Sequence, residues 1–149
     1  MEDQLIKKIS EELKDSIEEA RVLGPKRLLI KTLPKMHRDV IKYLKDKYSA
    51  THLITITGVD FKDFIELTYL LWCYGPATVA MVKTRLPRDN PEIETILDII
   101  PGALLYEREV HDLLGVFFKN HPNLERTFLP EDWPDGVYPL RKDVRFDQI

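Results

Sequence analysis

The segment YEREVHDLLGVFF, residues 106–118, holds the densest group of side chains that could do chemistry. Glu107 and Glu109 are carboxylates of the kind that act as a general acid and a general base. On a helix, however, these two glutamates lie on opposite edges of the apolar side, so they would not reach one substrate together. Paired-carboxylate catalysis therefore does not explain this segment, and a contact surface explains it better.

Metal binding is the second chemistry that this region could support. Glu107 and His111 are four residues apart, a spacing at which one helix face can present two ligands, and His121 could supply a third. The helix has no second histidine, and Cys73 is the single cysteine of the chain, so no thiolate cluster can form. We predict no catalytic, cofactor-binding or metal-ligating residue in this chain, and keep a stand-alone metal-dependent enzyme only as a remote alternative.

The composition argues against several other functions. The 149 residues include six glycines, and these form neither a P-loop nor a dinucleotide-binding motif. The formal net charge is -3 and the basic residues are scattered, so nucleic acid is not an expected partner. No apolar run approaches the roughly 20 residues that span a bilayer, and the polar residues are mostly lysine and glutamate, a bias seen in thermophilic proteins. These features indicate a globular, cytoplasmic domain that would reach a membrane only through partners.

The hydrophobic pattern predicts an α+β fold, in which helices pack on a mixed or antiparallel sheet of about four strands. In the first half, an amphipathic helix over residues 6–20 ends before the Gly-Pro pair at 24–25, and a strand over residues 26–32 follows. A second helix ending near Tyr48 and a strand over residues 51–58 complete this half.

The middle of the chain contains one ambiguous segment. Residues 61–74 fit an amphipathic helix about as well as a strand, and we favour the strand because Gly75-Pro76 would turn it into a hairpin with residues 77–86. Residues 88–100, RDNPEIETILDII, begin with a capping residue followed by proline, which predicts a helix. A further helix is expected after the Pro-Gly pair that follows.

Proline spacing changes the character of the chain after residue 120. Four prolines between residues 122 and 139 follow one another too closely for helices, while large apolar residues between them indicate packing rather than a free linker. We therefore divide the chain into an α+β domain, residues 1–120, and an extended Pro-rich C-terminal arm, residues 121–149, that packs on a partner subunit.

Two charge patterns suggest ion pairs. Arg108 and Asp112 are four residues apart on the helix and could pair, although an exposed pair contributes only about 0.3 to 0.5 kcal/mol. In the arm, the cluster of Arg141, Lys142 and Asp143 is expected to pair with carboxylates such as Glu107 and Glu109, or with those of a partner subunit.

The segment EREVHDLLGVFFKNHPNLERTFLPEDWPDGVYPLRKDV, residues 107–144, resembles the signature region of the thirty-kilodalton, C-type subunit of respiratory complex I and of its hydrogenase-complex relatives. The upstream part of the chain agrees with that family in outline only. The matching positions are Glu107, Arg108, Glu109, Asp112, Gly115, Phe118, His121, Pro122, Leu124, Arg126, Pro139, Leu140, Arg141, Lys142 and Asp143.

In that family the subunit is an α+β protein without a redox centre. It packs in the cytoplasmic arm of the complex against a large subunit descended from nickel-iron hydrogenase, close to a small iron-sulfur subunit. The resemblance implies a non-catalytic assembly subunit on the cytoplasmic side of the membrane, peripheral, whose partners carry iron-sulfur clusters and, in hydrogenases, a NiFe centre. Membrane ion-translocating subunits would be indirect partners. The residues that it places at subunit interfaces are Glu107, Arg108, Glu109, Asp112, His121, Arg126, Arg141, Lys142 and Asp143.

Two departures from complex I indicate the branch of the family. Leu104 and Leu105 stand where complex I members usually have Asn and Trp, and DGVYPLRKD has a longer approach to its proline. Both variants are similar to those of ferredoxin-linked, membrane-bound nickel-iron hydrogenases and sulfane reductases coupled to ion transport, which is the expected branch. The C-type subunit of an NADH or deazaflavin:quinone dehydrogenase stays as the alternative.

Overall fold

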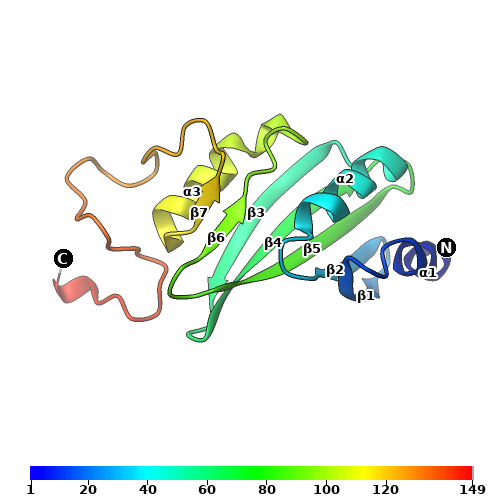
Figure 1. The fold of residues 1–149 in the computed structure, drawn as a ribbon, viewed down its shortest axis with the longest axis horizontal. Helices are drawn as coiled ribbons and strands as arrows, with labels where there is room; N and C mark the ends of the chain where they lie inside the picture. Colours follow the sequence, from blue (N-terminus) through cyan, green and yellow to red (C-terminus); the bar gives the residue numbers. More distant parts are fainter. Residues whose placement is uncertain (149) are drawn as a thin grey trace.

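A mixed five-stranded sheet forms the centre of the structure (Figure 1). The computed structural model describes residues 1–148. In chain order the elements are α1 (Glu2–Glu12), β1 (Ile17–Gly24), β2 (Arg27–Thr32), α2 (His37–Tyr48), β3 (His52–Asp60), β4 (Phe64–Cys73), β5 (Thr78–Pro87), β6 (Glu92–Glu94), η1 (Pro101–Ala103), α3 (Leu104–Leu114), β7 (Phe117–Lys119) and η2 (Phe146–Gln148). The sheet order is β1-β2-β5-β4-β3; the β2–β5 pair is parallel, and the other pairs of this sheet are antiparallel. The predicted α+β class is confirmed.

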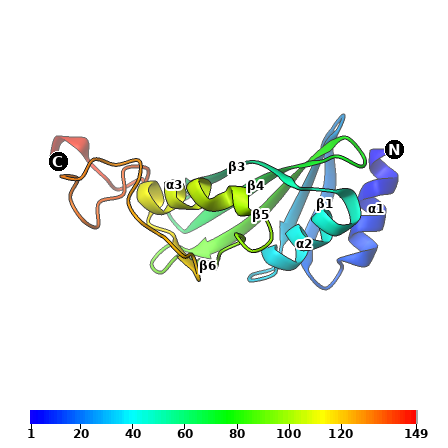
Figure 2. The same cartoon turned by 90° about the horizontal axis from the view of Figure 1, so that it is seen from above.

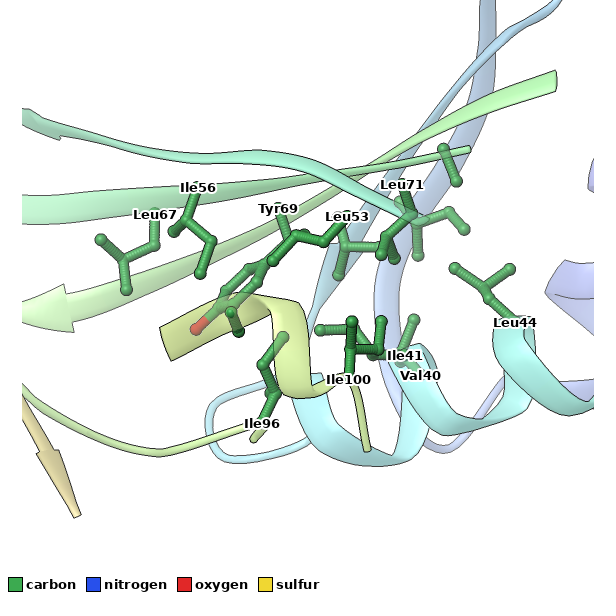
Figure 3. Close-up of a cluster of buried hydrophobic side chains, with 14 of the residues drawn as sticks. Val40, Ile41, Leu44, Leu53, Ile56, Leu67, Tyr69, Leu71, Ile96 and Ile100 are labelled. Atoms are coloured by element: carbon green, nitrogen blue, oxygen red, sulfur yellow. The ribbon is translucent and has the colours of Figure 1, made fainter. Parts of the chain in front are cut away.

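The core lies between the sheet and helices α2 and α3, which occupy the same side of it (Figure 2). Val40, Ile41 and Leu44 of α2 are fully buried and point toward the strands (Figure 3). Alternate residues of β4, among them Leu67 and Tyr69, face the same core. Each such side chain stabilises the fold by about 1.5 to 3 kcal/mol when fully buried, so the apolar pattern determines which face of the sheet carries the helices.

The predicted hairpin is present. Strands β4 and β5 pair in antiparallel register from Phe64 opposite Pro87 to Cys73 opposite Thr78. The strand prediction for the ambiguous segment is therefore correct, and the turn at Gly75-Pro76 joins the two strands.

The predicted helix over residues 6–20 is wrong in its second half. Helix α1 ends at Glu12, and Ile17 and Ala20 belong to strand β1. The register of β1 on β2 shifts between Ile17 and Glu19, so a bulge adds one residue to this edge strand. The extra residue places Ile17 and Ala20 on the same side of the strand, a spacing of three that imitates a helix.

The predicted helix over residues 88–100 is also wrong. Residues 92–94 form the short strand β6, which pairs in parallel with β7 in a separate two-stranded sheet. Beyond it, the Thr95 amide donates to the Lys119 carbonyl and the Ile96 amide donates to the Glu107 carboxylate. These amides have partners from distant segments, which outweigh the local helix signal. With β1 in addition, the main sheet has five strands instead of about four.

Residues 120–145 contain turns but neither helix nor strand, and they lie beyond α3 at the end of the molecule opposite the N-terminus (Figure 1). We call residues 121–148 the C-terminal arm. The division of the chain at residue 120 and the packing of the arm on a partner stay predictions, and Ile149 lies outside the described residues.

Candidate functional site

Glu107 is completely buried on the inner face of α3. Its Oε1 accepts the amide of Ile96 at 2.8 Å, and its Oε2 accepts the Thr95 hydroxyl at 2.5 Å. Burial raises the pKa of this carboxyl to about 7, because it penalises the charged form more than the two donors favour it. Glu107 thus anchors the segment after β6 to α3, which is a structural use of a residue that looked catalytic.

The two histidines near Glu107 have backbone partners. His121 Nε2 lies 3.4 Å from the Leu104 carbonyl and 3.8 Å from Glu107 Oε2, and burial lowers the pKa of this histidine. His111 Nδ1 lies 2.8 Å from the Val116 carbonyl, which it can bond only as a donor. Within residues 1–148, no group of three or more His, Cys, Asp or Glu side chains is placed to hold a metal ion.

Asp112 holds the start of the arm. Its side chain is 5% exposed, and Oδ2 accepts the amides of Thr127, Phe128 and Leu129 at 2.8, 2.7 and 3.4 Å. The predicted pair with Arg108 does not form, because Arg108 instead donates to the Glu125 carbonyl at 3.2 Å. Both residues therefore bind the backbone of the arm rather than each other.

Arg126 organises the arm internally. Its guanidinium donates to the Trp133 carbonyl at 2.8 Å and to Asp135 Oδ1 at 3.0 Å. A guanidinium has five N–H donors in a fixed plane, so one arginine can fix a turn that has no regular structure.

Arg141 closes the arm onto the C-terminal end of α3. Its Nε donates to the Leu114 carbonyl at 2.7 Å, while the Leu140 amide donates to the Leu113 carbonyl at 3.0 Å. These donors satisfy carbonyls that a helix leaves unpaired at its end, where a positive charge is also favoured. Gly115 ends the helix at φ +75°, and a Cβ there would lie 2.5 Å from the Tyr138 ring. The arm is thus fitted closely to this helix end.

Asp60 and Arg88, which sequence reasoning missed as site residues, form the second attachment point of the arm. Asp60 is 1% exposed and pairs with Arg88 through two bonds of 2.9 Å. It also accepts the amides of Lys62 and Lys142, and Arg88 donates to Asp143 at 3.0 Å. The bonds to Arg88 hold the pKa of Asp60 well below its usual range.

A signal for this pair exists in the sequence. Asp60 is the last residue of β3 and Arg88 directly follows β5, and both strands pair with β4. Because β4 runs antiparallel to both, the carboxyl ends of β3 and β5 meet at the same end of the sheet. If residues 51–58 had been added to the predicted hairpin as a third antiparallel strand, Asp60 and Arg88 would have been expected at the same end of the sheet.

The predicted pairing of Arg141 and Lys142 with the two glutamates is wrong. Arg141 bonds the carbonyls of Leu114 and Arg88, and Lys142 uses its backbone amide on Asp60. The side chains of Glu109 and Lys142 make no hydrogen bond or ion pair with the rest of residues 1–148. The structure therefore brings most of the predicted interface residues together as an internal joint between α3, the sheet and the arm.

None of the helices in the described part of the chain has the length and apolar character needed to cross a membrane.

Comparison with known proteins agrees with the resemblance seen in the sequence. The profile of the family described as respiratory-chain NADH dehydrogenase, 30 Kd subunit, matches residues 30–148. The C-type subunit of the F(420)H(2) dehydrogenase of Methanosarcina mazei is 38% identical over 93% of this chain and 89% of its own length. The beta subunit of the membrane-bound hydrogenase of Pyrococcus furiosus is 28% identical over 82% of this chain and 72% of its own length.

Solved structures share the fold. A chain of the membrane-bound sulfane sulfur reductase, an archaeal respiratory membrane complex, superposes with a TM-score of 0.87 at 34% identity, covering 98% of this chain and 86% of the other. A trypsin-resistant fragment of Nqo5 has the same fold, with a TM-score of 0.60 at 24% identity over 82% of this chain and 98% of the fragment. The relatives are thus subunits of complex I-related hydrogenase, sulfane reductase and dehydrogenase complexes. The chain belongs to the family of the 30-kDa subunit of the respiratory-chain NADH dehydrogenase.

Proposed function

We propose that this chain is a non-catalytic structural subunit in the cytoplasmic arm of a complex I-related, membrane-bound oxidoreductase. The observation that carries this proposal is the match to a subunit of the sulfane sulfur reductase over 98% of the chain at a TM-score of 0.87. The joint around α3 supports it, because the charged side chains of Asp112 and Arg141 bind backbone groups of their own chain.

Two kinds of complex are candidates. The first is a ferredoxin-linked nickel-iron hydrogenase or sulfane reductase coupled to ion transport, favoured by Leu104 and Leu105 and by the structural match. The second is an F(420)H(2) dehydrogenase, favoured by the 38% identity to the C-type subunit of such an enzyme over 93% of the chain. In either complex the chain itself would hold no cofactor, and its partners would be a hydrogenase-like large subunit and a small iron-sulfur subunit, which would hold iron-sulfur clusters.

Affinity purification of the tagged chain from detergent-solubilised native membranes tests the proposal. We expect a stoichiometric complex that contains a large subunit, an iron-sulfur subunit and membrane subunits, identified by mass spectrometry. Nickel in the complex and hydrogen evolution from reduced ferredoxin would select the hydrogenase. Sulfane reduction without nickel would select the sulfane reductase, and oxidation of F(420)H(2) would select the dehydrogenase. Recovery of the chain alone would contradict the proposal.

The side chains of Glu109 and Lys142 offer the sharpest test of where the partners bind. Both belong to the signature, yet neither is used within the described chain, so their charges are available to a neighbouring subunit. We expect Glu109→Lys to lower the yield of co-purified large subunit at least tenfold without changing the thermal melt of the isolated chain. Lys47→Glu, an exposed charge reversal in α2, is the matched control. Equal yields from both variants would place the interface elsewhere.

A further inference from the structure

We propose that the Glu107 carboxyl and the Thr95 hydroxyl form a reversible proton-binding site that makes the attachment of residues 95–100 to α3 depend on pH. This inference goes beyond the proposed assembly role, and it rests on the arrangement of donors and charges around one fully buried acid.

Among the described residues, no lysine or arginine side chain forms an ion pair with Glu107. His121 Nε2 lies 3.8 Å from Oε2. His121 Nδ1 accepts the amide of Asn123 at 3.1 Å, so the imidazole hydrogen sits on Nε2 and the ring is neutral. A second proton on Nδ1 would point at an N–H donor. The buried carboxylate therefore faces a neutral ring, and ionisation leaves it without a counter-charge.

The Thr95 hydroxyl can hydrogen-bond the Glu107 carboxyl in either of its protonation states. The Thr95 hydroxyl lies 2.5 Å from Glu107 Oε2 and accepts the amide of Leu97 at 3.1 Å. A hydroxyl has one donor and two acceptor positions, so it can donate to an ionised Glu107 or accept from a protonated one after a rotation of its hydrogen. The Ile96 amide bonds Oε1 in either state. If Glu107 only positioned the backbone, its partner would not need to be able both to donate and to accept a hydrogen bond.

The charged groups on the surrounding elements do not replace the missing counter-charge. From α2, Arg38 favours the ionised form, but its guanidinium is already held by Asp98, which opposes it. From β4, the buried Tyr69 hydroxyl lies close enough for the Glu107 charge to raise its pKa. From α3 itself, Arg108 and His111 lie toward His121 and lower its pKa, which keeps that ring neutral. Burial is the largest effect that remains, and it raises the pKa of Glu107 to about 7.

The consequence for stability has a definite sign. Glutamate in the unfolded chain ionises near pH 4.5, whereas buried Glu107 keeps its proton up to about pH 7. The folded state therefore binds one more proton than the unfolded state between these values, and stability falls as the pH rises through this window. Above it, the ionised carboxylate loosens residues 95–100, which also bind α2 through Arg38 to the Thr95 carbonyl and Lys45 to the Ile99 carbonyl.

Carbon-13 NMR of the glutamate side-chain carboxyls in the full chain tests the proton site directly. The Glu107 signal is assigned by its loss in Glu107→Gln, an uncharged replacement of nearly the same shape. We expect a midpoint near pH 7, shifted upward by more than one unit in Thr95→Val and by less than half a unit in Thr95→Ser. A midpoint between pH 4 and 5 in the wild type, or equal midpoints in the two Thr95 variants, would overturn the proposal.

Hydrogen exchange tests the link to residues 95–100. After correction for the intrinsic pH dependence of exchange, amides of this segment should exchange at least threefold faster at pH 8 than at pH 5.5 in the wild type. Glu107→Gln should abolish this difference while leaving amides of β4 unchanged. A difference that persists in Glu107→Gln would show that another group controls the segment, and no difference in the wild type would remove the pH dependence.

Discussion

Two carboxylates of this chain have almost no exposed surface, yet their pKa values are shifted in opposite directions. Asp60, 1% exposed, is bonded by a guanidinium and two backbone amides, and its pKa lies well below the usual range. Glu107, 0% exposed, has one amide, one hydroxyl and a neutral imidazole beside it, and burial raises its pKa to about 7. Low exposure alone thus does not determine the pKa of an acid: Asp60 lies nearer the surface and has a guanidinium partner, whereas Glu107 lies deeper and has none.

The two carboxylates also join different parts of the molecule. At Asp60 a permanent charge joins the ends of β3 and β5 to the arm, whereas at Glu107 a neutral or weakly charged group joins α3 to residues 95–100. We expect mutations at the Asp60 joint to lower the free energy of unfolding more than mutations at the Glu107 joint. Removing one partner of a buried ion pair leaves the other charge unsatisfied.

Arg88→Met gives the largest expected effect. Asp60 would stay buried without its counter-charge, so the free energy of unfolding, measured by urea denaturation, should fall further than in any of the variants below. Arg85→Met, three residues earlier on strand β5, is the matched control, because its bond to Glu66 is partly exposed and should matter by about 1 kcal/mol or less. Similar losses from both variants would show that charge pairing is not what distinguishes the Asp60 joint.

Asp112→Ala should have the next largest effect. The change removes one carboxylate oxygen that serves three amides of the arm, and charge-assisted bonds of this kind contribute about 1.5 to 3 kcal/mol. Limited proteolysis should cleave the variant near residues 127–129 before any cut in the sheet appears. Glu109→Ala, on the same helix, should melt like the wild type; an arm that stays protected in Asp112→Ala would contradict the assigned role.

Gly115→Ala asks whether shape as well as charge holds the arm. A left-handed backbone costs an L-residue about 1 to 2 kcal/mol, and the new Cβ would also press on Tyr138, so the melting temperature should fall by several degrees. Gly102→Ala should be neutral, because nothing lies within 4 Å of a Cβ there. If the two alanines behave alike, the close fit of the arm to the end of α3 contributes little.

Sequence patterns predicted the parts of the fold that depend on local signals. The β4–β5 hairpin was predictable because a Gly-Pro turn joins two alternating segments. The start of strand β1 was predicted as helix because a bulge after Ile17 gives its apolar residues helical spacing. Residues 92–96 carry a local helix signal, but their amides bond β7 and Glu107 instead of one another. Neither cause can be read from neighbouring residues.

The sequence predicted several residues of the candidate site but not the groups to which they hydrogen-bond. The signature correctly drew attention to Glu107, Asp112 and Arg141, yet each bonds backbone groups, which every residue possesses and no sequence pattern marks. A search for opposite charges therefore paired Arg141 with glutamates instead of with the carbonyl of Leu114. Asp60 was overlooked because its charged partner, Arg88, follows a different strand 28 residues further along the chain.

The bond from the Lys142 amide to Asp60 spans 82 residues, and this length has a consequence for the order of folding. During synthesis, Asp60 and Arg88 leave the ribosome well before residue 142. Their side chains can therefore pair at the ends of β3 and β5 before the arm has been made. Closing a loop of this size costs only about 0.6 kcal/mol more than closing one half as long, so late arrival is a small penalty. The finished sheet would then serve as the template on which the last residues of the chain settle.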